Sequence, residues 1–232
     1  MKVCISEFTF KAFKKLFNDS LKSHELILID SSGSLVRGKG KPDITFASYE
    51  VMFKCLNDGA YKKRFFSLID GSDFIQGSWA GVESEVAQEL IRRTRNFSHG
   101  GGLHAITLAT YVFAQMLRHV KGIDAHIELQ RQKKWKPMLL PGELTDLVIG
   151  IVGFGGIGKE IARLAKAFRM NVLATKRTKV SFEHLDHLFK PSDLDKMLSK
   201  CDFVINCLPV TEETKKIFSL KQFKVMKSSS MF

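Results

Sequence analysis

The sequence has few of the features that mark secreted, membrane-spanning or zinc-binding proteins. Its 232 residues include four cysteines, none in a Cys-x-x-Cys pair, so no disulfide framework and no metal site is indicated, and reduced thiols in a cytoplasmic protein are expected. No apolar run approaches the roughly 20 residues that a membrane-spanning helix requires. The first ten residues, MKVCISEFTF, are too polar for a signal peptide. We therefore expect a globular protein that does not enter a membrane.

Acidic residues are also in the minority. There are 24 of them against 36 lysines and arginines, which gives a formal net charge of +12. The basic residues are dispersed along the polar faces of helical patterns, and no zinc-finger spacing or aromatic RNA-binding motif accompanies them. We therefore favour a basic surface that attracts anionic small molecules over a nucleic-acid site.

One glycine-rich turn stands out in residues 147–168, LVIGIVGFGGIGKEIARLAKAF. A run of apolar and β-branched residues predicts a buried parallel strand, and an amphipathic helix follows the turn. Gly153, Gly155 and Gly158 give the order strand, G-x-G-x-x-G, helix, which is the context that a dinucleotide-binding fingerprint needs. Gly153 permits the tight turn, Gly155 lets the backbone approach a pyrophosphate, and Gly158 lets helix and strand pack closely. The helix N-terminus offers amide groups and a positive dipole end to the phosphates.

Strand and helix patterns alternate along the chain and predict an α/β protein with parallel sheets covered by helices. A change at the HGGG segment, residues 99–102, predicts a domain boundary, so we expect domains at 1–102 and 103–232. Residues 33–42 are rich in Gly, Ser and Lys and predict an exposed loop, and a turn is expected over residues 137–146. The main expected strands are 3–5, 25–30, 43–47, 74–76, 171–175 and 202–207, and the main expected helices are 8–21, 61–68, 103–119, 123–135 and 194–198.

The end of the second strand of the fingerprint unit bears on the choice of cofactor. In NAD-binding sites an acidic residue about 20 positions after the first glycine binds the ribose 2′-hydroxyl. Here that place falls near Lys176, with Arg177 and Thr178 following. Two cations and a hydroxyl suit a 2′-phosphate, so we predict NADP(H), with NAD(H) possible. The alternative is that Lys176 and Arg177 are solvated loop charges.

Four segments together resemble the D-isomer-specific 2-hydroxyacid dehydrogenases, the family that includes glyoxylate/hydroxypyruvate reductases. They span about 160 residues in the family's order: FIQGSWAGVE (74–83), HAITLATYVFAQML (104–117), GFGGIGKEIARLAKAF with NVLATKR (153–177) and CLPVTEETKKIF (207–218). The resemblance implies a flavodoxin-like substrate domain and a Rossmann cofactor domain with a doubly wound parallel sheet. It also implies a small 2-oxo or 2-hydroxy acid as substrate and a homodimer.

The resemblance also assigns roles to individual residues. The backbone amides of Ala80, Gly81 and Val82 would hold the substrate carboxylate, which small residues in a tight turn suit. Gly156 and Ile157 would lie over the pyrophosphate. The remaining cofactor contacts would come from Cys207, Leu208, Pro209 and Thr214.

Three departures from the family pattern qualify the resemblance. Glu83 stands where Asp is usual, and Thr110 stands where the crossover helix generally has Glu. The family's catalytic Arg and its Glu and His acid–base pair would all follow Phe232, so no catalytic residue is assigned within the chain and we expect the 232 residues alone to be inactive. His184 and His187 share a predicted helix face, but a solvated face is favoured over a metal site.

Two functions therefore remain as hypotheses. The first is an NAD(P)-dependent oxidoreductase that reduces a 2-oxo acid such as glyoxylate or hydroxypyruvate. The second is a dinucleotide-sensing regulatory protein, similar to a corepressor, on the same scaffold. Oxidation of NADPH in the presence of a 2-oxo acid would distinguish them.

Overall fold

The computed structural model describes residues 1–137 and 142–232. Their contacts divide the chain into two compact units, Met1–Gly101 and Gly102–Phe232, which we call the first and the second unit. The turn predicted over residues 137–146 lies partly outside the described residues. Within the described residues, no helix combines the length and the apolar character needed to cross a membrane.

The first unit is an α/β domain built on a six-stranded sheet. Its elements are β1 (Lys2–Ser6), α1 (Glu7–Ala12), α2 (Lys14–Ser20), β2 (Glu25–Ile29), β3 (Leu35–Arg37), β4 (Ile44–Ala47), α3 (Tyr49–Asn57), α4 (Gly59–Ile69), β5 (Phe74–Gly77), α5 (Glu85–Arg93) and β6 (Asn96–Ser98). The strand order is β3-β2-β1-β4-β5-β6. The five strands other than β3 pair in parallel and follow the flavodoxin-like order.

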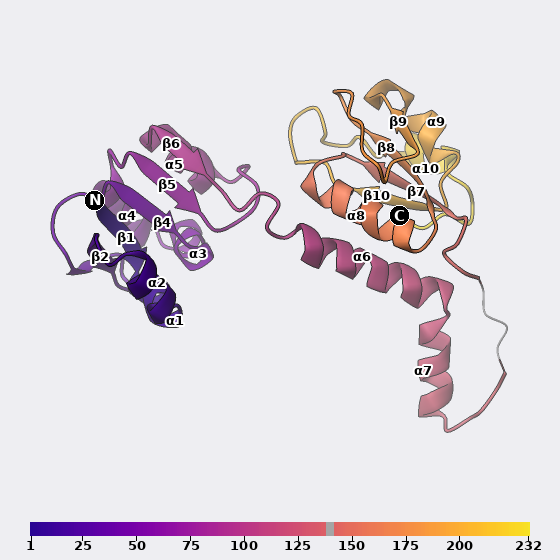
Figure 1. Ribbon diagram of the computed structural model, residues 1–232, viewed down its shortest axis with the longest axis horizontal. Coiled ribbons are helices and arrows are strands. Elements are labelled where there is room, and N and C mark those ends of the chain that lie inside the picture. The colour runs from indigo at the N-terminus through magenta and orange to yellow at the C-terminus, as the bar shows by residue number, and fades with distance from the viewer. Residues whose placement is uncertain (138–141) are drawn as a thin grey trace. The chain divides into compact units, whose positions relative to one another are not determined.

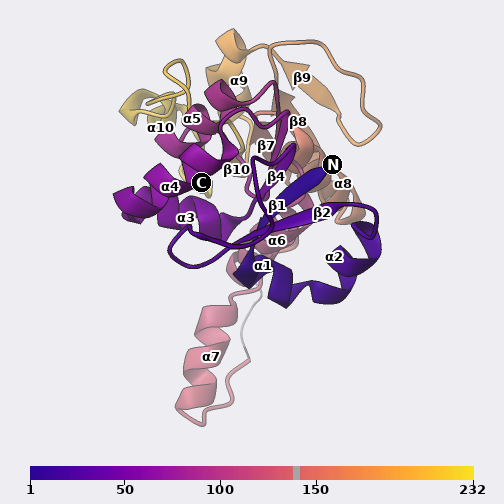
Figure 2. The same ribbon diagram turned by 90° about the vertical axis from the view of Figure 1, so that its left-hand side faces the viewer.

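Alternation along the strands sends neighbouring side chains to opposite faces of this sheet. Cys4 packs in one core with Tyr61 and Phe65, on the face that α3, α4 and α5 cover. Val3 and Ile5 pack with Phe10 on the opposite face, under α1 and α2. Figure 2 shows the two helix groups on either side of the strands. The sheet is therefore buried on both faces, as its apolar strands require.

The second unit has a parallel sheet of four strands. Its elements are α6 (Ala105–Val120), α7 (Ile123–Arg131), β7 (Val148–Val152), α8 (Gly156–Ala167), β8 (Asn171–Thr175), β9 (His187–Phe189), η1 (Pro191–Asp193), α9 (Leu194–Leu198), β10 (Phe203–Asn206) and α10 (Leu220–Val225). The strand order is β10-β7-β8-β9, parallel throughout. The chain moves outward from β7 through β8 and β9 and then returns to its other side with β10, so a topological switch point lies beside β7, as in Rossmann folds.

Helices cover both faces of the second sheet as well. Phe113 of α6 and Ile161 of α8 pack with Ile149 and Ile151 of β7 on one face. Leu198 of α9 packs with Val152 and Val204 on the other, and Figure 1 shows α6 and α8 opposite α9 and α10. The predicted α/β class with a Rossmann-like parallel sheet is therefore confirmed.

Some local expectations were wrong. The helix predicted over residues 8–21 breaks at Phe13 into α1 and α2, and the Phe13 side chain is 56% exposed. The expected loop at 33–42 is exposed but contains β3, which pairs antiparallel with β2. His184 and His187 do not share a helix face, because His187 begins β9. The strands β3 and β9 are short, and pairing with a neighbouring strand decides their conformation.

Candidate functional site

The three glycines of the fingerprint turn differ in what surrounds them. Gly153 follows β7 with φ +96°, and a Cβ there would lie 3.0 Å from the backbone carbonyl carbon and oxygen of Cys207. A Cβ on Gly158 would lie 2.6 Å from the carbonyl oxygen of Gly153. A Cβ on Gly155 would meet no atom within 4 Å. Packing therefore requires glycine at positions 153 and 158, whereas Gly155 opens onto empty space.

The N-terminus of α8 lies directly after this open position. Gly155 is its N-cap residue and has no side chain to accept a hydrogen bond from the first turn. The first amide groups of a helix point outward with the positive end of the helix dipole. The turn thus leaves an anion-binding helix end beside an open backbone position.

The end of β8 packs against this turn. The amide of Gly153 donates to the backbone oxygen of Thr175 over 3.3 Å and is 3.4 Å from its hydroxyl oxygen. The Lys176 amino group donates to the carbonyl oxygen of Phe154 over 2.9 Å, so it is engaged by the turn itself. Arg177 makes no hydrogen bond or ion pair with any described residue, so its guanidinium remains available to a ligand.

The segment after β10 forms the facing wall. The Cys207 amide donates to the carbonyl oxygen of Val152 over 2.7 Å. The Thr214 hydroxyl accepts from the Thr211 amide over 2.8 Å and donates to the carbonyl oxygen of Pro209 over 2.5 Å. Burial raises the pKa of the Cys207 thiol to about 11, so the thiol is protonated and a poor nucleophile at neutral pH.

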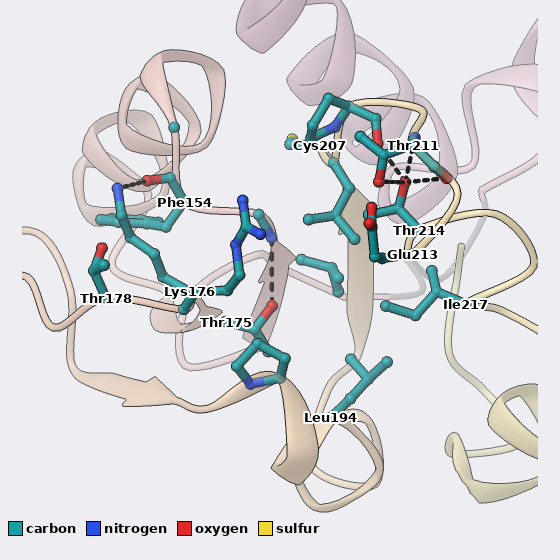
Figure 3. Close-up of a pocket in the computed structure, with 17 residues that line it drawn as sticks. Phe154, Thr175, Lys176, Thr178, Leu194, Cys207, Thr211, Glu213, Thr214 and Ile217 are labelled. Atoms are coloured by element: carbon teal, nitrogen blue, oxygen red, sulfur yellow. Dashed lines mark hydrogen bonds between the residues drawn. The ribbon is translucent and has the colours of Figure 1, made fainter.

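Together these segments enclose a cavity of about 590 Å³ at the carboxyl ends of β7, β8 and β10, a size typical of small-molecule sites. Figure 3 shows Lys176 and Thr178 on one side and Cys207, Glu213 and Thr214 on the other. Of the predicted cofactor residues, nine line it: Gly153, Gly155, Lys176, Arg177, Thr178, Cys207, Leu208, Pro209 and Thr214.

The predicted cofactor residues and the residues that line the cavity are not the same set. Gly156, Ile157 and Gly158, in the first turn of α8, do not line the cavity. Four cavity residues that matter for its polarity and shape were not predicted: Phe154, Thr175, Thr211 and Glu213. Phe154 and Thr175 lie at the carboxyl ends of two predicted strands, the edge of a parallel sheet at which ligands bind, and this position was a signal for them.

The predicted substrate loop lies in the first unit, after β5. Gly81 has φ +86°, which gives the tight turn that glycine favours. Ala80 is exposed, and within the described part of the chain no acceptor receives a hydrogen bond from the amides of Ala80, Gly81 or Val82. Successive amides of this kind suit a carboxylate. Their role in substrate binding stays a prediction.

The residues that depart from the family pattern have local roles or none. The hydroxyl of Thr110 donates within α6 to the carbonyl oxygens of Ile106 and Thr107, at 2.9 Å each, and Glu83 is exposed. Across residues 1–137 and 142–232, no group of three or more metal-binding side chains forms.

The family model for the NAD-binding domain of D-isomer specific 2-hydroxyacid dehydrogenases matches residues 113–232. A glyoxylate reductase of Pyrococcus furiosus is 36% identical over 159 residues, which cover 65% of this chain and 47% of the relative. The fold and the sequence therefore define the second unit as a dinucleotide-binding Rossmann domain. The chain belongs to the D-isomer specific 2-hydroxyacid dehydrogenase family and spans about half the length of this curated relative.

Solved structures show the same fold. A D-isomer specific 2-hydroxyacid dehydrogenase from Xanthobacter autotrophicus Py2, in complex with NADPH and MES, matches with a TM-score of 0.73 and 16% identity over 99% of this chain and 70% of its own. A D-lactate dehydrogenase from Aquifex aeolicus, complexed with NAD and lactic acid, matches with a TM-score of 0.68 and 19% identity over 97% and 66%. At these identities the likeness concerns the fold alone.

Proposed function

We propose that the protein is an NAD(P)-dependent oxidoreductase that reduces a small 2-oxo acid such as glyoxylate or hydroxypyruvate. The observation that carries this proposal is Gly155, open to the cavity at the uncapped start of α8. A packing role does not account for this glycine, whereas a pyrophosphate that approaches the backbone does. Family membership supplies the substrate class.

The cavity fits a nicotinamide dinucleotide, which would supply the hydride. The amides at Gly155, Gly156 and Ile157 would hold the pyrophosphate at the helix end. Arg177 and Thr178 would hold the 2′-phosphate of NADP(H), because the guanidinium is a bidentate phosphate partner. No carboxylate stands at the end of β8 to select NAD(H), although the described cavity leaves room for that cofactor too.

In the same proposal, the amides of Ala80, Gly81 and Val82 bind the carboxylate of the 2-oxo acid. We assign no proton donor among the residues of this chain.

We further propose a homodimer and a cytoplasmic location. Ile106 and Tyr111 of α6 are 66% and 64% exposed, and Trp135 after α7 is 93% exposed. Large apolar side chains exposed on the surface are typical of a subunit interface. All four cysteines are free, as in reducing compartments. Analytical ultracentrifugation checks the dimer.

The test of the function has two parts. Titration of the chain with NADPH and NADH, followed by nicotinamide fluorescence, should show saturable binding that Gly155→Val abolishes. The protein encoded by the whole reading frame that contains these residues should then oxidise NADPH with glyoxylate or hydroxypyruvate. Binding without oxidation across a panel of 2-oxo acids would instead support a dinucleotide-sensing regulator, and absence of binding would refute both.

A further inference from the structure

Two opposite charges line the cavity from segments that follow different strands. Arg177 follows β8, and Glu213 lies in the turn between β10 and α10. Figure 3 shows Glu213 on the wall opposite Lys176 and Thr178, the residues on either side of Arg177 in the sequence. Both Arg177 and Glu213 are exposed. The cavity thus contains a carboxylate as well as the cation expected to bind a phosphate.

The other charges nearby are already engaged. The cavity's remaining charged residue is Lys176, and its amino group bonds to the carbonyl oxygen of Phe154. Glu212, next to Glu213, forms an ion pair with Lys215 over 2.5 Å and does not line the cavity. Neither Arg177 nor Glu213 forms an ion pair with a described residue within 4 Å. Glu213 is therefore the one carboxylate among the described residues that line the cavity, and Arg177 is the cation there that no hydrogen bond holds.

The turn that carries Glu213 is held in place, and the carboxyl is ionised at neutral pH. The Thr214 hydroxyl ties the Thr211 amide to the carbonyl oxygen of Pro209. Hydrogen bonding from the Thr211 hydroxyl and from the residue's own backbone, and then the positive charge of Arg177, hold the pKa of Glu213 below its usual range. A fixed negative charge therefore faces the site where Arg177 would meet a 2′-phosphate.

We propose that Glu213 determines cofactor specificity: its carboxylate is the intramolecular counter-charge of Arg177 and competes with the ribose 2′-phosphate of NADP(H). This inference rests on the proposed dinucleotide-binding function. Binding of NADP(H) brings a dianionic phosphate into the cavity that Glu213 lines, where it competes with the carboxylate for the positive charge of Arg177, whereas NAD(H) has only a hydroxyl at that position. Glu213 thus reduces the preference for NADP(H) and allows the site to accept both cofactors.

The size of the effect follows from the exposure of the two groups. Exposed charges interact weakly and are screened over about 8 Å at physiological ionic strength. We expect Glu213→Gln to tighten NADPH binding about two- to fivefold at low salt, a range typical of exposed charge pairs. NADH binding should change less than about twofold, because its ribose places no charge near Glu213.

The matched control is Glu212→Gln, which removes the same charge from the same turn outside the cavity. It should leave the dissociation constants of both cofactors unchanged.

In an Arg177→Gln background, which should weaken NADPH binding by tenfold or more, Glu213→Gln should no longer favour NADPH as strongly, because the counter-charge has no cation to neutralise. The coupling measured in this double-mutant cycle isolates the pair. Salt near 0.5 M should shrink it.

Several results would overturn the inference. Equal tightening of NADPH and NADH by Glu213→Gln would show that the carboxylate acts on the shared pyrophosphate. An equal effect of Glu212→Gln would show a general charge effect, and unchanged NADPH affinity in Glu213→Gln would show no competition. In each of these cases the unaltered chain still binds both cofactors, so the proposed function stands. If the unaltered chain binds neither cofactor, the inference fails together with the proposed function.

The variant Lys176→Met tests whether Lys176 only holds the glycine-rich turn in place or binds the 2′-phosphate itself. Because Lys176 holds the carbonyl of Phe154, its loss should weaken NADPH and NADH binding by similar factors of about threefold, the value of one ordinary hydrogen bond. A selective loss of NADPH binding in this variant would instead make Lys176 the phosphate ligand and Glu213 its competitor, and would overturn the pairing with Arg177.

Discussion

The two units have the same kind of sheet, but their first strand-to-helix turns are built differently. In the first unit, β1 leads into α1 through Ser6, whose side chain accepts a hydrogen bond from the Thr9 amide over 3.1 Å. In the second unit, β7 leads into α8 through Gly153 and Gly155, and no side chain caps the helix. The N-terminus of α1 is capped by a side chain of its own chain, whereas the first amide groups of α8 have no side-chain acceptor.

This difference shows that a parallel sheet with flanking helices does not by itself make a nucleotide site. The Ser6 hydroxyl also donates to the Glu50 carboxylate over 2.7 Å, so a negative charge already occupies the start of α1. At α8 the corresponding space is empty, and a Cβ at Gly155 would meet nothing. A helix N-terminus can bind an anionic ligand when the residue at its N-cap position has no side chain that caps it.

The largest effect that we predict is a loss of stability in the first unit that leaves cofactor binding by the second unit unchanged. Phe65→Ala should lower the free energy of unfolding of the first unit by about 3–5 kcal/mol, because Phe65 is 1% exposed within its core. NADPH affinity should not change, since no cavity-lining residue belongs to Met1–Gly101. Urea unfolding followed by the fluorescence of buried Trp79 measures the loss. Phe53→Ala, at a position 57% exposed, is the control, and a weakened NADPH affinity in folded Phe65→Ala would contradict the separation.

A smaller effect concerns the close approach of helix to strand in the second unit. Gly158→Ala should cost about 1–3 kcal/mol of stability, because its Cβ would lie 2.6 Å from the backbone oxygen of Gly153. Gly156→Ala, in the same turn of α8, meets only an ordinary contact of 3.6 Å and should keep or raise stability. Thermal unfolding followed by circular dichroism compares the two. Equal melting temperatures would show that the helix shifts at no cost.

High pH should weaken both units. Burial raises the pKa of Cys4, Cys55 and Cys201 from 9.0 to about 12. Above pH 9 these thiols ionise in the unfolded chain but stay protonated in the folded one. Stability is therefore complete below pH 9 and falls as pH rises toward 12, by at most about 1.4 kcal/mol per thiol per pH unit. Urea unfolding at pH 8 and pH 10 measures the fall, and Cys55→Ala should reduce its slope in the first unit alone.

The smallest predicted effect on stability comes from removing the side-chain cap of α1 and adding one to α8. Ser6→Ala should cost about 1 kcal/mol, the usual value of an N-cap. Gly155→Ser should stabilise α8 by a few tenths of a kcal/mol, because its hydroxyl can cap the helix, but should weaken NADPH binding at least tenfold. Differential scanning calorimetry and cofactor titration test the pair. Unchanged NADPH affinity in Gly155→Ser would mean that the open position is not where the pyrophosphate binds.

Elements with a clear sequence pattern were predicted well, including the short β8 and α9, but two local features were missed. The apolar run before Gly153 and the amphipathic pattern after it correctly gave β7 and α8. The break between α1 and α2 at Phe13, and the strand β3 within a polar segment, were missed. Packing and strand pairing, which a local pattern does not contain, decide such short segments.

The α/β class, the dinucleotide fingerprint and the family resemblance could be read from the amino-acid sequence, because alternating apolar strands and a glycine triplet at fixed spacing are local properties of the chain. Which side chains share the cavity became visible in the folded structure. It assigned Lys176 to the Phe154 carbonyl and brought Glu213 to the cavity that Arg177 lines. These residues follow different strands, β8 and β10, and they come together because the carboxyl ends of parallel strands share one edge of the sheet.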